Sequence, residues 1–151
     1  MGGRPEDALP QFLAGRRIDD VIDQDELDEK RTGAYYGNVG RCLHLMGQID
    51  QALICYQKSA LLIEKKDTGH RVYNQGFVRK WIGEVLLSKN NVVLGAAFLR
   101  AAYLKWKGTA PPLAEEAFEM YLEIERSCEA LTHLSDDKVE EMSLDWIFSR
   151  R

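Results

Sequence analysis

Residues 36–59, YGNVGRCLHLMGQIDQALICYQKS, and residues 79–102, RKWIGEVLLSKNNVVLGAAFLRAA, share one pattern at an offset of 43 residues, and this repeat decides the fold. Large apolar side chains fall on large ones and small on small, whereas Tyr36 and Arg79 break the match. The matched pairs are Val39 and Ile82, Gly40 and Gly83, Leu43 and Leu86, Gly47 and Asn90, Ala52 and Gly95, Tyr56 and Leu99, and Ser59 and Ala102. An internal period of about 20–50 residues is typical of helical solenoids, in which each repeat is one supersecondary unit.

Apolar residues at helical spacing predict helices along almost the whole chain. We expect them over residues 18–29, 31–46, 50–65, 70–89, 92–107 and 111–131, followed by a last helix that Ser135 caps. Gly47 and Asn90 are the predicted turns inside the two repeats, because glycine adopts the left-handed conformation at a helix end without steric cost. No stretch alternates as a strand would, so the sequence predicts an all-α protein with more than about 60% helix.

The spacing resembles the signature of tetratricopeptide (TPR) repeats, in which an aromatic residue is followed by Leu-Gly and later by Ala and a second aromatic residue. The first copy carries this pattern at Tyr36, Val39, Gly40, Leu43, Ala52 and Tyr56, and Asn38 and Gly47 also look like TPR residues. In the second copy Arg79, Gly95 and Leu99 depart from the signature. The period is also longer than the family's value of about 34 residues.

The resemblance implies a short right-handed α-solenoid that forms a single domain over residues 1–151. Residues 31–65 and 70–108 are then its two repeats, and the acidic segments 1–30 and 111–149 are its caps. Such elongated repeats are similar to TPR regions attached to larger bacterial signalling proteins. We therefore expect a domain cut from a longer protein and a separate protein equally. Six repeat positions are predicted at close helix contacts: Gly40, Ala52, Tyr56, Gly83, Gly95 and Leu99.

In TPR proteins the first helix of each repeat lines a concave groove that holds a partner. Transferred by position, the groove residues are Gly37, Arg41, His44, Phe77, Lys80 and Glu84. Phe77 then serves as an apolar anchor, and Arg41 and Lys80, together with Arg79, bind an acidic peptide through charge-assisted hydrogen bonds. The plainer interpretation is that these are ordinary solvated charges. Gly37 and Glu84 stand where chaperone-binding TPR domains need other residues for a carboxylate clamp, which disfavours that subclass.

The charges form three blocks although the net charge is only −4. Residues 1–32 carry five Lys or Arg against nine Asp or Glu, residues 33–109 carry eleven against four, and residues 110–151 carry four against eleven. The repeat region is therefore basic and both flanks are acidic. Such asymmetry concerns partners rather than fold. It predicts that the repeats attract either an acidic partner or the chain's own flanks.

The sequence carries no motif for catalysis or for a cofactor. It has no glycine-rich phosphate loop, no G-x-S-x-G and no H-E-x-x-H. Glu115, Glu116 and Glu119 form only the carboxylate pairs that a helix surface produces by chance. The three cysteines lack the short spacings of a zinc site, and their odd number argues against a disulfide framework. We therefore expect no enzyme and no metal or cofactor site.

The function that the sequence favours is binding of a protein or peptide segment. No stretch of about 18 apolar residues exists and no signal peptide opens the chain, so we expect a cytoplasmic protein without a membrane span. Self-association into a homo-oligomer through Trp146 and Phe148, in a regulatory role, stays open. Nucleic-acid binding by the basic repeats also stays open, although the sequence pI of about 5.4 disfavours it. Among the tryptophans we expect Trp106, between Lys105 and Lys107, to be the most exposed.

Overall fold

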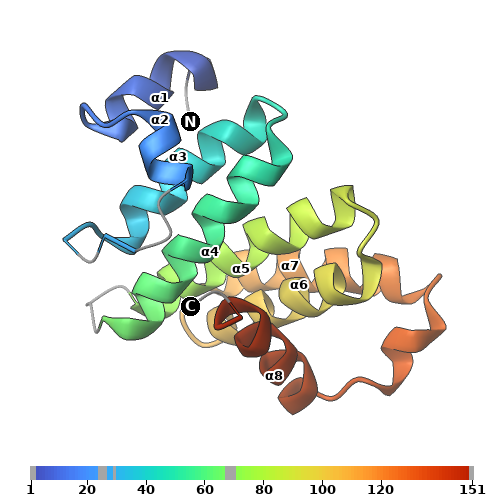
Figure 1. The fold of residues 1–151 in the computed structure, drawn as a ribbon. Helices are drawn as coiled ribbons and strands as arrows, with labels where there is room; N and C mark the ends of the chain where they lie inside the picture. The colour runs from blue at the N-terminus through green and yellow to red at the C-terminus, as the bar shows by residue number, and fades with distance from the viewer. Residues whose placement is uncertain (1–2, 24–26, 29, 67–70, 150–151) are drawn as a thin grey trace. The chain divides into compact units, whose positions relative to one another are not determined.

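The computed structural model describes residues 3–23, 27–28, 30–66 and 71–149, and helices take up 79% of them (Figure 1). The elements are α1 (Pro5–Leu13), α2 (Ile18–Asp23), α3 (Gly33–Leu45), α4 (Ile49–Lys65), α5 (Arg71–Ser88), α6 (Val92–Trp106), α7 (Pro111–Glu125), the 3-10 helix η1 (Glu129–His133) and α8 (Asp136–Ile147). These ranges contain no strand, which confirms the all-α prediction.

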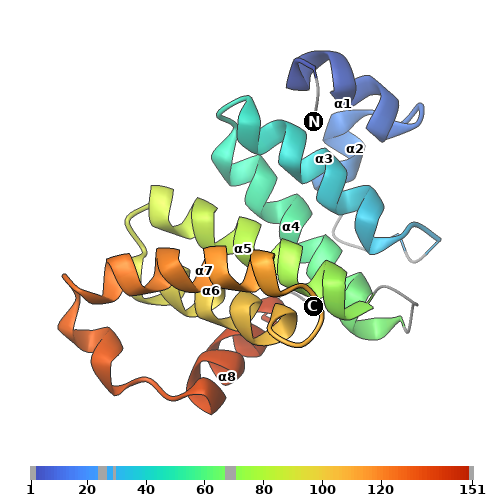
Figure 2. The same cartoon turned by 180° about the vertical axis from the view of Figure 1, so that it is seen from behind.

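The chain divides into two compact units, which are residues 1–66 and residues 67–151. In the first unit α3 and α4 form a helical hairpin, with α1 packed on α3 and α2 packed on α4. In the second unit α5 and α6 form a hairpin of the same kind. Here α6 is central, because α7, η1 and α8 all pack on it. Figure 2 shows α7 running beside α6.

The turns inside the two hairpins share one backbone conformation. Gly47 follows α3 with a φ of 82°, and Asn90 follows α5 with a φ of 63°, so both lie in the left-handed region. Glycine visits this region at low cost, and asparagine is one of the few other residues that does so routinely. The structure thus confirms both predicted turns and explains why asparagine can stand where the first repeat has glycine.

The hydrogen bonds around these turns repeat at the same offset. The N–H of Gln48 donates to the carbonyl of Leu43 at 2.8 Å, and the N–H of Asn91 donates to the carbonyl of Leu86 at 2.9 Å. This closure is that of a Schellman motif, which satisfies carbonyls at a helix end. Gln48 and Asn91 then lead into the next helices with nearly equal angles, φ −87° and ψ 73° against φ −89° and ψ 76°. The sequence repeat is therefore also a repeat of backbone structure.

Glycines bring the two helices of each hairpin into close contact. A methyl group on Gly40 would lie 2.7 Å from Cδ1 of Tyr56. A methyl group on Gly83 would lie 2.8 Å from the carbonyl oxygen of Gly95 and 3.2 Å from the side chain of Leu99. These distances are shorter than van der Waals contact, so neither position has room for a side chain. All six residues predicted at close helix contacts are buried.

The repeat extends beyond the residues that the sequence comparison paired. Gly33 faces Ile63 and Gly76 faces Trp106, and both members of these pairs keep the same offset. A methyl group would lie 2.4 Å from Cγ1 of Ile63 in the first hairpin and 2.2 Å from Nε1 of Trp106 in the second. Trp106 is fully buried, and its Nε1 donates to the carbonyl of Tyr73 at 3.0 Å. The expectation of an exposed Trp106 is wrong because its ring packs directly on Gly76.

The helix predicted over residues 111–131 ends early. It continues as α7 only to Glu125, and the separate 3-10 helix η1 follows. The chain turns back here because Leu131 is fully buried and its carbonyl accepts a hydrogen bond from the hydroxyl of Tyr121 at 3.3 Å. The predicted cap of the last helix is confirmed, since the Ser135 hydroxyl accepts from a backbone N–H at 3.1 Å.

The helix predicted over residues 18–29 is described as α2 only to Asp23; residues 24–26 and 29 lie outside the described part, and those between them are not helical. The last carbonyls of a helix have no partner inside it. Here the buried ammonium of Lys58 supplies one, because it donates to the carbonyl of Val21 at 2.5 Å. The same hydrogen bond attaches α2 to α4.

Candidate functional site

The residues predicted to line a groove are divided between the units, with Gly37, Arg41 and His44 in the first. Gly37 is buried within α3, and the ring of His44 has two polar neighbours at one nitrogen. Its Nδ1 atom lies 3.1 Å from the hydroxyl of Tyr56 and 3.3 Å from a guanidinium nitrogen of Arg41. The structure therefore brings Arg41 and His44 together and joins them to a core tyrosine.

Phe77, the predicted apolar anchor, is half-buried in a group of aromatic rings in the second unit. Its ring centroid lies 4.9 Å from that of Tyr73, 5.6 Å from that of Trp81 and 4.8 Å from that of Trp106. Because these neighbours belong to the same unit, the Phe77 ring serves the packing of α5 on α6.

Lys80 and Glu84 lie one turn apart on α5 and form an ion pair at 3.8 Å. Lys80 also donates to Oε1 of Glu116 on α7, at 3.0 Å. The structure thus brings these two predicted groove residues together, and the lysine already has a carboxylate partner on each of two helices.

Arg79, which the sequence groups with Arg41 and Lys80, is fully buried. Its Nη2 donates to Oε1 of Glu140 on α8 at 3.2 Å, and the same oxygen lies 3.5 Å from Nζ of Lys105. The prediction that Arg79 helps to bind an acidic peptide is wrong, because its guanidinium group faces α8 of its own chain.

Arg100 joins α6 to the C-terminal part of the second unit. It donates to Asp136 at 2.7 Å and to the carbonyl of Leu134 at 2.8 Å, and it lies 3.2 Å from the hydroxyl of Tyr121. Partial burial alone lowers the pKa of Arg100, but hydrogen bonds to Asp136 and Tyr121 raise it above its usual value. Burial raises the pKa of Tyr121, and its hydrogen bond with Glu125 adds to this effect.

The acidic C-terminal flank thus pairs with the basic repeat region of the same unit. This is the second of the two outcomes that the charge blocks predict, and it accounts for the alternation of charge along residues 67–151. The pairs that join the two blocks are Lys80 and Glu116, Arg79 and Glu140, Lys105 and Glu140, and Arg100 and Asp136.

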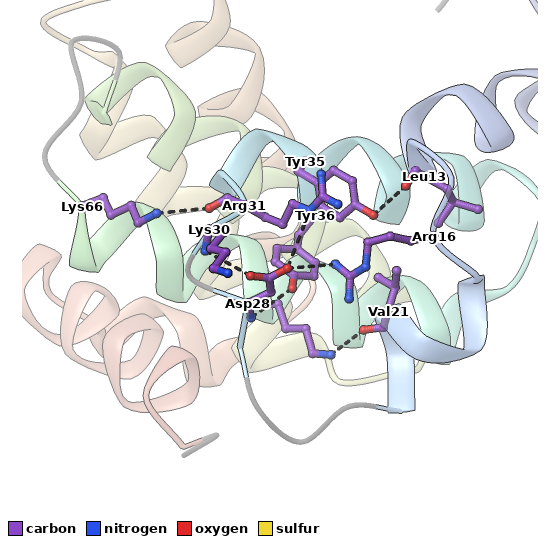
Figure 3. Close-up of polar contacts among 10 residues, drawn as sticks. Leu13, Arg16, Val21, Asp28, Lys30, Arg31, Tyr35, Tyr36 and Lys66 are labelled. Carbon is purple, nitrogen blue, oxygen red and sulfur yellow. Dashed lines mark hydrogen bonds and ion pairs between the residues drawn. The ribbon is translucent and has the colours of Figure 1, made fainter.

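In the first unit a cluster of charges and tyrosines ties the N-terminal segment to α3 (Figure 3). Asp28 lies 3.6 Å from a guanidinium nitrogen of Arg16 and 3.7 Å from one of Arg31. The guanidinium of Arg31 stands 4.9 Å from the centroid of the Tyr35 ring, whose hydroxyl donates to the carbonyl of Leu13 at 2.9 Å. These contacts connect successive elements of one unit, so they describe a structural joint.

A hollow on the surface of the second unit is the better candidate for a binding site. It lies between the C-terminal end of α6 and the first turns of α7, and its volume is about 470 Å³. Ligand sites typically have volumes of about 300–1,000 Å³. This α6–α7 hollow is lined by Tyr103, Lys107, Pro111, Ala114, Glu115, Phe118 and Glu119.

Aromatic rings and carboxylates give the α6–α7 hollow its character. The rings of Tyr103 and Phe118 are half-buried, with centroids 4.5 Å apart and planes tilted by 31°. Glu115 and Glu119 are exposed and one helical turn apart, and neither forms an ion pair with any residue that the structure describes. In the sequence these glutamates look like chance pairs on a helix surface, because only the packing of α7 on α6 places them beside aromatic rings.

Comparison with known proteins identifies no relative of this chain. It matches no protein-family model, no curated protein and no solved structure. Within the described ranges, no three His, Cys, Asp or Glu side chains converge in a way that would hold a metal ion. In the same ranges no helix is both long enough and apolar enough to cross a membrane.

Proposed function

We propose that this chain is a protein-interaction module that holds a segment of a partner polypeptide in the α6–α7 hollow. The observation that carries the proposal is the hollow itself, which is lined by half-buried aromatic rings and by exposed charged side chains. Aromatic residues in well-packed pockets contribute a large share of the binding energy between proteins. The helices that form the border, α6 and α7, are packed against each other, so the site requires little ordering on binding.

We propose further that the hairpins α3–α4 and α5–α6 are successive TPR-like repeats of a right-handed α-solenoid, with the flanking helices as caps. The shared turn geometry and the glycine contacts at the same offset support this interpretation. Repeat scaffolds of this kind present extended surfaces to partners, which is the role proposed for the chain as a whole.

The groove predicted on α3 and α5 is a weaker candidate for the same function. Two of its polar residues already have partners in their own unit, since Lys80 pairs with Glu116 and His44 contacts Tyr56. A ligand in this groove would have to displace those contacts. A ligand in the α6–α7 hollow would not have to displace an ion pair of Glu115 or Glu119, because neither forms one with a described residue.

Self-association through the last helix is the second candidate function, and one observation favours it. Phe148 is 44% exposed although it is a large apolar residue. Trp146 contributes less than the sequence predicts, because its ring packs 5.5 Å from that of Phe98 inside the unit. A surface of one exposed aromatic residue is small compared with stable homodimer interfaces.

Selection of random phage-displayed peptides against the immobilised full chain tests the proposed function. We expect enriched peptides, and we expect them to cross-link to a photoreactive residue introduced at Lys107, which lines the hollow. A matched probe at Lys138, an exposed lysine on α8, serves as the control and should give little cross-linking. Failure to enrich any peptide, or equal cross-linking at both positions, contradicts the proposal. A sedimentation mass that rises with concentration in the absence of peptide supports self-association instead.

A further inference from the structure

The α6–α7 hollow has a charge that selects its occupant. Two carboxylates, Glu115 and Glu119, border it, against the single ammonium of Lys107. At a spacing of four residues their Cβ atoms are about 5–6 Å apart on one face of the helix. A planar cation with several N–H donors can bridge two carboxylates at such a distance.

The aromatic lining favours the same kind of occupant. Tyr103 and Phe118 contribute ring surfaces to the hollow. Aromatic faces attract cations, and the guanidinium group of arginine stacks on them more readily than an ammonium group does. Apolar wall residues, Pro111 and Ala114, suit the methylene groups that precede the charge of a long basic side chain.

Other basic residues of the same unit are engaged elsewhere. Lys80 pairs with Glu116 on α7, and Arg100 pairs with Asp136 at the start of α8. Lys107 borders the hollow without an ion pair to any described residue, and its charge opposes the entry of a second cation. Removal of the Lys107 charge should therefore strengthen binding of a cation, whereas removal of the glutamates should weaken it.

We propose that the α6–α7 hollow receives the side chain of an arginine from a basic segment of the partner polypeptide. This inference rests on the proposed function and names the chemistry of the partner. The guanidinium group lies against the rings and donates to Glu115 and Glu119. The partner is thus basic at this surface, whereas the sequence predicts that the repeat region attracts either an acidic partner or the chain's own flanks.

Titration with single amino-acid derivatives tests the chemistry without a known partner. Nα-acetyl-arginine amide is added to the 15N-labelled full chain, and amide shifts are followed by NMR. The neutral isostere Nα-acetyl-citrulline amide and the Glu derivative serve as ligand controls. We expect saturable shifts at residues around the hollow, with about fivefold or greater preference for arginine over citrulline.

Two matched double variants separate a specific contact from overall charge. Glu115→Gln with Glu119→Gln should weaken arginine binding about fivefold or more. Glu123→Gln with Glu129→Gln changes the net charge equally at exposed residues outside the hollow and should leave binding nearly unchanged. Lys107→Gln should strengthen binding. Circular dichroism of each variant verifies that it keeps its helices.

The possible results distinguish this inference from the proposed function. Equal binding of arginine and citrulline, shifts remote from the hollow, or equal losses in both double variants would overturn the arginine site. If phage selection nevertheless enriches peptides that cross-link at Lys107, the proposed function stands with a different occupant. If arginine amide binds as expected but no peptide is enriched, the site chemistry stands and the proposed function fails.

Discussion

Position 47 shows how one residue type can determine where a hairpin turns. Its φ of 82° disfavours any residue with a Cβ atom, yet Asn90 occupies the equivalent turn. We therefore predict that Gly47→Ala lowers the free energy of unfolding by about 1–2 kcal/mol. Gly47→Asn should cost less, because the asparagine side chain can hydrogen-bond locally in this conformation. Urea unfolding followed by circular dichroism measures both, and equal losses in the two variants would contradict the argument.

A second prediction at this scale concerns the thiol of Cys42. Burial raises its pKa in the folded chain. Below about pH 8.5, the pKa of an exposed thiol, folded and unfolded chains both hold the proton and the shift has no effect on stability. Above it the unfolded chain releases the proton while the folded chain keeps it, so stability falls by up to about 1.4 kcal/mol per pH unit.

Urea midpoints measured at about pH 7.5 and about pH 9.5 check this prediction, since the pH window follows from the thiol reference value. Cys42→Ala is the informative variant, because it removes the titrating group and should flatten the loss of stability with pH. An unchanged loss in this variant would show that other groups cause it. The raised pKa of Tyr121 acts in the same direction, but only from about pH 10 upward.

At the scale of helices, the close approach of α5 to α6 depends on Gly83. A methyl group there meets the backbone carbonyl of Gly95 at 2.8 Å, and backbone cannot move aside as a flexible side chain can. We predict that Gly83→Ala destabilises the chain by about 1–3 kcal/mol. Gly108→Ala is the matched control, because no atom lies within 4 Å of a methyl group at that position. Similar melting temperatures for the two variants would contradict this account of the hairpin.

Most helices of the fold could be predicted from the sequence, because a stripe of apolar residues records which face is buried. The turns at Gly47 and Asn90 follow from local conformational preference in the same way. The end of α7 does not, since it depends on the contact between Tyr121 and Leu131. The burial of Trp106 does not follow from its neighbours in the sequence, because Lys105 and Lys107 point from other faces of the helix.

The candidate site was less accessible to sequence reasoning than the fold. Glu115 and Glu119 belong to a candidate site only because α6 places Tyr103 in the same hollow. No local sequence pattern predicts that packing. The sequence predicts Arg79 as a surface cation, because it does not show that Glu140 pairs with this side chain. Pairs that join distant parts of the chain are the information that a single sequence lacks.

At the scale of the whole molecule, the second unit encloses buried clusters made of its own residues. One contains Leu99 with Tyr121 and Leu131, and the other contains Trp106 with Ala117. We predict that residues 67–151 expressed alone give a helical circular dichroism spectrum and unfold cooperatively in urea. The single-domain expectation makes the opposite prediction, an isolated segment without a cooperative transition, so the measurement decides between them.

The mismatch of Tyr36 with Arg79 has a consequence for how the hairpins are ordered along the chain. Tyr36 accepts a hydrogen bond from the N–H of Asp28, at 3.3 Å, whereas Arg79 presents a buried guanidinium to Glu140. Each hairpin is therefore matched to its own neighbour at this position. If the two hairpins exchanged places, Glu140 would meet a phenol and Arg79 would lose its carboxylate. This irregularity in the repeat thus gives each hairpin a contact that suits its own neighbour, the N-terminal segment for α3 and α8 for α5.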